Sequence, residues 1–230
     1  MTPVFELATV DTDGAISEAQ ERVAGDTRAA FFRKAAIGGG AVIGSSAFLG
    51  MLPELAVGKP SKARDLAILN YALTLEFLEA EFYRQAVANG IGSDSVKSLA
   101  KQIYDHEATH VKALIQTIKS LGGKPVKEPK FDFKGTTESE DNFLATAFVL
   151  ENTGVHAYLG QAGRLKSKAL LGAAASIVTV EARHAAAVAI LAGGGYSDND
   201  NGISPDSAFD TPLSKKAVLN AVGDTGFIKG

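Results

Sequence analysis

Apolar residues recur at steps of three and four through most of residues 62–192, which is the spacing of one face of an α-helix. Leu69, Leu73 and Phe77 are an example from the first part of this region. Polar and glycine-containing stretches break the pattern at intervals, as expected where one helix ends and the next begins. The pattern therefore predicts four helices, over about 62–88, 94–121, 137–165 and 168–191.

Signals at the expected helix ends agree with these limits. Ser61 is the expected N-cap of the first helix, and Asn89-Gly90 is a stop signal at its other end. Thr137 and Glu140 have the spacing of a capping box. This pattern predicts that the third helix begins near Thr137.

The lengths of the connections predict the topology. The first and second helices are joined by a few residues, and so are the third and fourth, so each pair is expected to form an antiparallel hairpin. The link 123–136 is longer, contains Pro125 and Pro129, and can run the length of the bundle as a crossover. Each helix is roughly 35–45 Å long at 1.5 Å per residue. The sequence predicts an all-α fold, an antiparallel four-helix bundle with one long crossover.

The flanking regions differ from the bundle in composition, and they suggest four parts. Residues 1–34 are polar without a period and form an N-terminal extension. Residues 35–60 hold an apolar segment and a linker, and the bundle takes 61–192. The tail, 193–230, is rich in turns until a short helix near its end.

The apolar segment 35–52 carries no charge and follows Arg33 and Lys34. It is just long enough to span a bilayer, and the positive charges before it would stay on the cytoplasmic side. The stretch TRAAFFRKAA also resembles a twin-arginine export leader, except that Ala29 replaces the second arginine.

We favour an export signal or anchor as the role of 35–52. The protein would then be exported or held on the outer face of the cytoplasmic membrane, in contact with it. In the other interpretation this segment is a glycine-rich helix, packed on the protein's own surface or on another subunit of a homo-oligomer. The protein would then be cytoplasmic.

Composition excludes several classes of function. Lys and Arg number 23 against 26 Asp and Glu, and this net charge of -3 gives no basic surplus for nucleic acid. The chain has no cysteine, which excludes disulfides, zinc–thiolate sites and cysteine-bound iron–sulfur clusters. Any metal must be held by carboxylate and imidazole groups.

Two of the four predicted helices contain a Glu-x-x-His pair. The second helix has Glu107 and His110, and the fourth has Glu181 and His184. Residues three apart lie on one helix face, so both side chains of a pair can reach the same point. With only four histidines in the chain, two such pairs in mid-helix are improbable by chance.

The other two helices each contribute a glutamate in apolar surroundings, Glu76 and Glu151, followed seven residues later by Tyr83 and Tyr158. The two halves of the chain thus repeat one order of residues: Glu, Tyr, then Glu-x-x-His. A helical side chain leans toward the N-terminus of its helix, so Tyr83 is expected to point back toward Glu76, and Tyr158 toward Glu151.

This repeat resembles the ferritin-like di-iron carboxylate superfamily, in which two helices each give one Glu and two give Glu-x-x-His. Within it, ILNYALTLEFLEAEFY (68–83) is similar to the first helix of bacterial ferritin-like proteins related to plant desiccation-related proteins. The similarity covers about 62–192, and AFDTPLSKKAVLNAV (208–222) is similar to that family's end.

The resemblance implies a ligand role for each matching residue. Glu76 and Glu151 are terminal ligands, Glu107 and Glu181 bridge two metals, and His110 and His184 each complete one. Four buried carboxylates carry a charge that two divalent ions neutralise. An oxygen and nitrogen donor set suits Fe or Mn.

Other residues near this pattern have alternative interpretations. Glu79, three residues after Glu76, is an alternative or extra ligand, and the repeated tyrosine spacing favours Glu76. His106 lies about 100° around the helix from Glu107 and is expected at the edge of the site, at most in contact with a ligand. His156 lies about 140° from Glu151 and is placed outside the ligand set. Tyr83 and Tyr158 either pack with a satisfied hydroxyl, or they hydrogen-bond to a ligand or donate electrons.

The leading functional hypothesis is a redox protein in which two Fe or Mn ions react with dioxygen or peroxide. Ferroxidase activity or peroxide removal in stress protection are its two expected forms. The alternative is a structural or stress-interaction helical module, in which metal is only a staple or is absent.

Overall fold

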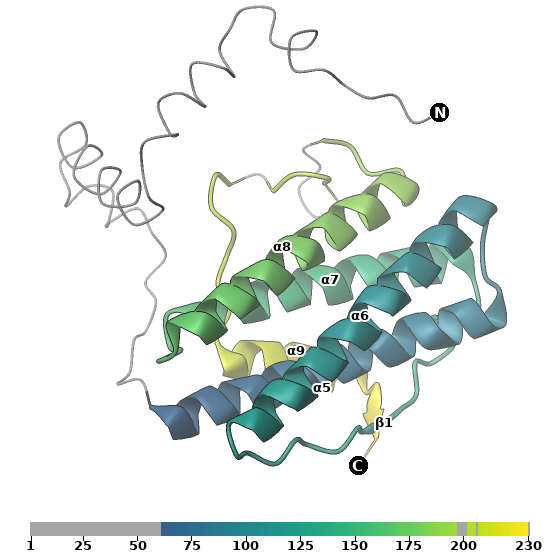
Figure 1. The fold of residues 1–230 in the computed structure, drawn as a ribbon. Coiled ribbons are helices and arrows are strands. Elements are labelled where there is room, and N and C mark those ends of the chain that lie inside the picture. The colour runs from purple at the N-terminus through teal and green to yellow at the C-terminus, as the bar shows by residue number, and fades with distance from the viewer. Residues whose placement is uncertain (1–60, 197–201, 206, 230) are drawn as a thin grey trace, which may run out of the picture. The chain divides into compact units, whose positions relative to one another are not determined.

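The computed structural model describes residues 61–196, 202–205 and 207–229 (Figure 1). The predictions on the extension 1–34 and the apolar segment 35–52 lie outside these residues. They remain predictions.

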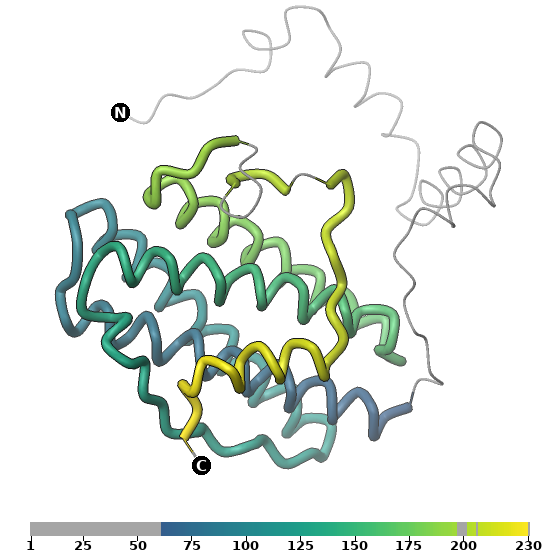
Figure 2. The backbone as a smooth tube through the Cα atoms, turned by 180° about the vertical axis from the view of Figure 1, so that it is seen from behind, coloured from purple at the N-terminus to yellow at the C-terminus, as the bar shows by residue number. Residues whose placement is uncertain are grey.

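Four long helices form the molecule's core and confirm the predicted fold class. They are α5 (Lys62–Asn89), α6 (Asp94–Ser120), α7 (Glu140–Ala162) and α8 (Lys168–Leu191). α5 packs mainly against α6, and α7 against α8, so the bundle is built from two antiparallel hairpins. Seen from behind, α7 runs antiparallel to α5 (Figure 2). The short helix α9 (Lys215–Thr225) confirms the helix expected in the tail.

Each of these five helices begins at a serine. The hydroxyl of each cap accepts a hydrogen bond from the backbone N–H three residues later, which satisfies one of the free donors of the first turn. The caps are Ser61, Ser93, Ser139, Ser167 and Ser214. The predicted cap of α5 is therefore confirmed, and Gly90 ends α5 with a left-handed φ of 63°.

The start of α7 differs from the prediction. The capping box at Thr137 is not formed, and Ser139 caps the helix instead. Thr137 is buried, where its backbone and hydroxyl oxygens accept hydrogen bonds from the amide of Asn89. The Glu140 carboxylate accepts a hydrogen bond from the backbone N–H of Ser93, at 2.6 Å. Both polar groups of the expected box are thus used to tie α7 to the α5–α6 turn.

The crossover and the tail meet in a small sheet that the sequence did not predict. In the crossover, β1 (Lys130–Phe131) pairs antiparallel with β2 (Ile228–Lys229) at the chain's end. The tail also crosses α7 closely, because a Cβ at Gly160 would overlap the carbonyl oxygen of Leu213. The tail is therefore packed on the bundle at both places.

Apolar side chains form two groups in the bundle. The larger contains an aromatic cluster, in which Phe82 stacks on Phe143 and meets Tyr83 and Phe133 edge to face. The smaller is mainly aliphatic, with Phe77 as its one buried ring among the described residues, and its other members include Leu114, Ile118 and Leu170. Between these groups lie the buried polar residues.

Among the described helices, only α8 is long and apolar enough to cross a membrane, with a mean hydropathy of 1.4. Two features of the fold account for the apolar composition of α8. One side faces the bundle, and the other exposes small residues such as Gly172 and Ala173 together with a few larger apolar ones such as Leu171 and Ile190.

Candidate metal centre

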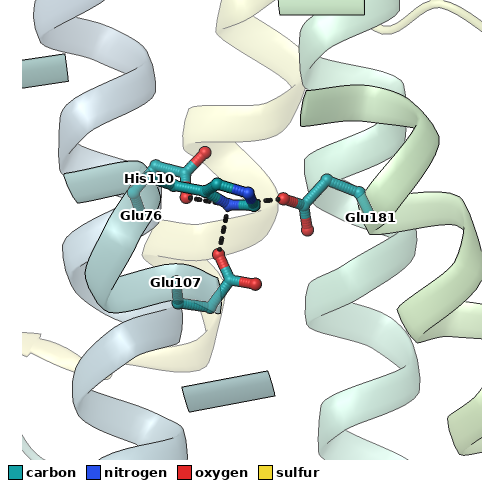
Figure 3. A group of neighbouring side chains, drawn as sticks. All are labelled: Glu76, Glu107, His110 and Glu181. Atoms are coloured by element: carbon teal, nitrogen blue, oxygen red, sulfur yellow. Dashed lines mark hydrogen bonds and ion pairs between the residues drawn. The ribbon is translucent and has the colours of Figure 1, made fainter. Parts of the chain in front are cut away.

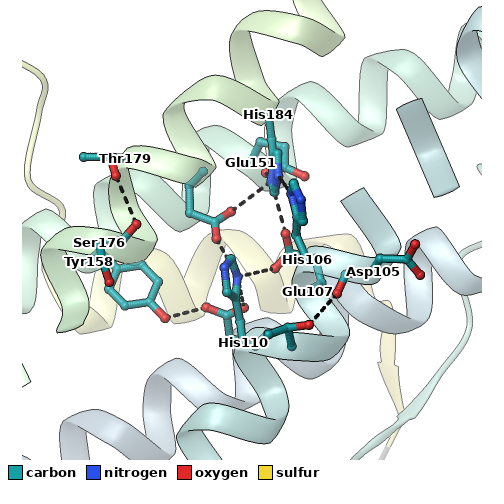
Figure 4. Close-up of polar contacts among 12 residues, drawn as sticks. Asp105, His106, Glu107, His110, Glu151, Tyr158, Ser176, Thr179 and His184 are labelled. Atoms are coloured by element: carbon teal, nitrogen blue, oxygen red, sulfur yellow. Dashed lines mark hydrogen bonds and ion pairs between the residues drawn. The ribbon is translucent and has the colours of Figure 1, made fainter. Parts of the chain in front are cut away.

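All four long helices send acidic or histidine side chains to one place inside the bundle (Figure 4). The six residues are those expected from the repeat: Glu76 from α5, Glu107 and His110 from α6, Glu151 from α7, and Glu181 and His184 from α8. The four glutamates are 0% exposed. Unpaired buried carboxylates are too costly to be explained by packing.

His110 is the centre of one group (Figure 3). Its Nδ1 atom lies 3.0 Å from Oε2 of Glu107. The same nitrogen lies 3.2 Å from Oε2 of Glu76 and 3.2 Å from Oε1 of Glu181. One nitrogen and three carboxylate oxygens therefore converge here from three helices.

His184 is the centre of the second group. Its Nδ1 atom lies 3.1 Å from Oε1 of Glu107 and 3.1 Å from Oε2 of Glu151. Oε2 of Glu181 is more distant, at 3.8 Å. This group has the composition of the first, with Glu151 in place of Glu76.

Two carboxylates belong to both groups. Glu107 offers Oε2 to the His110 group and Oε1 to the His184 group, and Glu181 divides its oxygens in the same way. Within each group, the candidate ligand atoms all lie within 4.8 Å of one another. The two groups therefore have two of their four residues in common, and each group could hold a metal ion.

Several carboxylate oxygens lack a hydrogen bond of good geometry from any described residue: Oε1 of Glu107, Oε1 of Glu151, and both oxygens of Glu181. Buried acceptors without donors are rare in folded proteins. These oxygens are therefore available to a cation, and their chemistry fits hard divalent ions such as Fe(II) or Mn(II).

Without metal, the two imidazoles hold the carboxylates together. Burial favours the neutral ring of His110, but the surrounding carboxylates, Glu107 first, outweigh it and raise its pKa to about 12. The same balance raises the pKa of His184 to about 12. Each protonated ring then places an N–H at the point where its carboxylates converge. A metal ion must displace this proton to bind Nδ1.

The acidic members differ in their protonation. Burial raises the pKa of Glu76 and of Glu151 well above the usual value, against an opposing hydrogen bond from one histidine each. Glu107 is also desolvated, but the hydrogen bond from His110 and the ion pair with His184 hold its pKa at about 2. Glu107, which contacts both imidazoles, therefore stays ionised.

The tyrosines reach the cluster, but the expected pairing is wrong. Tyr158 donates a hydrogen bond to Oε1 of Glu76 rather than pointing to Glu151. Tyr83 is fully buried, and after burial itself the Glu151 carboxylate is the main cause of its raised pKa. Seven residues along a helix cover roughly 10 Å, too far for a side chain to reach back. Because α5 and α7 are antiparallel, each tyrosine lies level with the other helix's glutamate.

Glu79 breaks the symmetry between the two halves. It is 3% exposed, lies outside both ligand groups, and has a raised pKa, first from burial and then from Glu181. The matching position on α7, three residues after Glu151, is Gly154. A Cβ there would lie 3.1 Å from Oε1 of Glu79. The missing side chain of Gly154 thus leaves room for a fifth buried carboxyl.

The remaining two histidines lie outside the ligand groups. His106 Nδ1 is 2.8 Å from Nε2 of His184, and the two rings stack at 5.1 Å. Helix periodicity placed His106 at the edge of the site but could not show that it contacts a ring on α8. His156 pairs with Asp210 of the tail at 3.0 Å.

Comparison with known proteins gives one match. The model of a family described as a ferritin-like domain matches residues 64–194, which include all six cluster residues. A search of the curated proteins found no match.

Proposed function

Since the chain belongs to the ferritin-like domain family, we propose that its Glu/His cluster is a di-metal carboxylate centre. Its metals would be two Fe or Mn ions, and it would react with dioxygen or peroxide. Fold membership alone does not carry a reaction, so the proposal depends on the geometry of the site.

One observation carries the proposal. Glu107 and Glu181 each direct one oxygen to the His110 group and the other to the His184 group. A single metal would need only one of these groups, whereas two metals would be held by both, with Glu107 and Glu181 common to the two. Glu76 and Glu151 would then each serve one ion as terminal ligands.

Charge balance supports two divalent ions. The four glutamates of the ligand groups carry four negative charges when ionised, which two such ions neutralise. The fifth carboxyl, Glu79, lies outside the ligand groups, and in the metal-free protein burial raises its pKa well above the usual value. A buried, neutral acid beside the ligands is a source of protons at the site.

Two bound Fe(II) or Mn(II) ions would supply the electrons that reduce dioxygen or peroxide. The chain's own residues fix the surroundings. Tyr158 holds the Glu76 carboxylate through its hydroxyl, and His106 contacts the outer nitrogen of His184. Such partners fix ring orientation and tautomer of metal-binding histidines. The four glutamates are fully buried, away from bulk solvent.

Ferroxidase activity or peroxide removal in stress protection are the forms we propose first. Similarity of 68–83 to the bacterial relatives of plant desiccation-related proteins supports a protective role. We also propose that residues 35–52 direct export or anchoring, because this segment is uncharged and follows basic residues.

A second candidate, a structural module, is favoured by the metal-free pairing. Each imidazolium contacts three carboxylates, so the cluster can hold the four helices together without metal. The two candidates differ in whether a loaded protein turns over.

The test is oxidation of Fe(II). Full-length protein receives two equivalents of Fe(II) without oxygen and is then mixed with dioxygen or peroxide. We expect ferric absorbance to form much faster than in protein-free buffer, and Glu107→Ala to abolish this acceleration. Glu81→Ala is the matched control, because Glu81 lies on α5 but pairs with Arg84 at the surface. Rates equal to buffer in loaded wild type would favour the structural module.

A further inference from the structure

A cavity of about 70 Å³ lies inside the bundle beside the cluster, and all four long helices contribute to its wall. Ala72 lies four residues before Glu76, and Leu114 lies four residues after His110. Four residues make about one helical turn, so these two wall residues stack directly on two cluster residues.

The other two helices meet the cavity in the same way. Ile177 of the wall lies one turn before Glu181 on α8. From α7, Tyr158 contributes to the wall and donates its hydroxyl to Glu76. Figure 4 shows this tyrosine beside the cluster. The side chain of Tyr158 is therefore shared between the cavity and the cluster.

The wall is apolar and uncharged, but it is not purely hydrocarbon. None of the described residues that line it is charged at neutral pH. Two of them carry a buried polar atom without a hydrogen-bond partner, the hydroxyl of Tyr71 and Nε2 of Gln161. Both residues are 5% exposed. Such a group costs about 1–3 kcal/mol unless something pairs with it, so these atoms point to a bound polar group.

The cavity is accessible between α6 and α8. Ala113 of α6 and Ala173 of α8 line it and are exposed. Small side chains at this edge leave a path for a small molecule to the wall at Tyr158.

Comparison with the opposite end of the cluster, near Tyr83 and Glu151, shows that the fold alone does not create this cavity. The residue before Tyr83 is Phe82, which is 0% exposed, whereas the residue before Tyr158 is Ala157. Phe143 lies eight residues before Glu151, at the end away from the cavity. Ile68 lies eight residues before Glu76, at the cavity. In both comparisons, Phe82 with Ala157 and Phe143 with Ile68, the residue at the cavity is the smaller one.

We propose that the cavity binds a small, neutral organic molecule with a short hydrocarbon body and one hydroxyl or carbonyl group. Its polar group pairs with Tyr71 and Gln161, and its body lies against the apolar wall. A cavity of about 150 Å³ holds benzene, so this one takes about three heavy atoms, with longer chains reaching the opening. The molecule would lie one helical turn from the cluster, which adds a ligand to the proposed function without depending on it.

The test uses 1-propanol and full-length protein, with binding followed by saturation-transfer NMR. We expect saturable binding on the order of 10 mM, the range that so few atoms allow. Propionate and propylammonium, which have the same body with a charge, are expected to bind at least tenfold more weakly. Xenon, followed by its own NMR shift, reports the cavity without the polar group.

Variants separate the polar from the apolar part of the site. Tyr71→Phe and Gln161→Leu are expected to weaken 1-propanol at least fivefold while xenon still binds. Ala157→Phe copies the other end of the cluster and is expected to abolish both. If that variant does not fold, Ala174→Leu fills the cavity from α8. Ala175→Leu, at an exposed position next to it, is the control and retains binding.

The inference is overturned if wild type shows no saturable binding, if propionate binds as well as 1-propanol, or if the cavity-filling variant that folds retains binding. In Mn(II)-loaded protein, the relaxation of bound 1-propanol protons is expected to rise several-fold, and no rise would contradict a site beside the cluster. Metal content is measured on the same samples. Loss of propanol binding with metal present rejects only this inference, and absence of metal with propanol binding intact rejects only the proposed function.

Discussion

The two ends of the buried cluster carry the same residues but are packed differently. At one end, the ring of Tyr83 meets Phe143 edge to face at 5.7 Å, and its hydroxyl lies near Glu151. At the other end, Tyr158 bonds to Glu76 and borders a cavity. A repeated ligand pattern therefore produces a nearly symmetric cluster. The neighbours of the two tyrosines, Phe82 and Ala157, differ in size, and this difference determines at which end a cavity borders the cluster.

The largest expected effect comes from opening the packed end. Phe82→Ala removes a ring in contact with three other rings and should lower the free energy of unfolding by about 3–5 kcal/mol. Urea denaturation measures the change, with Val149→Ala on exposed α7 surface as the control, expected within about 0.5 kcal/mol. A loss below about 1 kcal/mol for Phe82→Ala would mean that the two ends are packed alike.

A second effect is expected from pH and concerns the cluster that both ends enclose. Folding raises the pKa of both histidines, so their contribution is complete below about pH 6.5 and is lost as pH rises toward 12. The raised pKa values of Glu76 and Glu151 act in the same direction above about pH 4.5. Metal-free protein should therefore melt at a temperature several degrees lower at pH 9 than at pH 6.

Metal-loaded protein is the comparison for this experiment. Metal binding requires deprotonated ligands, so its stabilisation grows as pH rises. Calorimetry of both forms from pH 6 to 9 should give slopes of opposite sign. Parallel slopes would show that the histidines are not protonated in the metal-free cluster.

The smallest expected effect distinguishes the two tyrosines. Tyr158→Phe removes a hydrogen bond to Glu76 and should destabilise metal-free protein by about 1 kcal/mol. Tyr83→Phe removes a buried hydroxyl without a hydrogen-bond partner among the described residues, so stability should stay within about 0.5 kcal/mol or rise. Equal losses in the two variants would contradict the difference between the ends.

Sequence alone predicted the four helices and their hairpin topology because both depend on local signals, periodicity and link length. The start of α7 was predicted wrongly, because it depends on contacts with residues far away in the sequence, which local signals do not show. Thr137 and Glu140 have the spacing of a capping box, yet Asn89 and Ser93 from another part of the chain bind them instead. The β1–β2 pairing joins residues about a hundred positions apart and also had no local signal.

For the site, the two Glu-x-x-His pairs and the repeated order of residues pointed to the six residues that the structure brings together, with Glu79 left as an alternative to Glu76. Helix periodicity could not predict contacts between residues of different helices. The tyrosine pairing depends on the antiparallel register of α5 and α7, and the burial of Glu79 depends on Gly154 of another helix. The cavity depends on Ala157 standing where the first half has Phe82, a difference that is readable in the sequence once the repeat is aligned.

Metal stoichiometry by elemental analysis tests the central claim, that two ions share Glu107 and Glu181, most directly. After loading and desalting, wild type should retain two ions per chain, Glu107→Ala almost none, and Glu76→Ala one. Glu79→Ala should retain two, because Glu79 lies outside both ligand groups. Two ions in Glu107→Ala, or only trace metal in wild type, would contradict the di-metal centre.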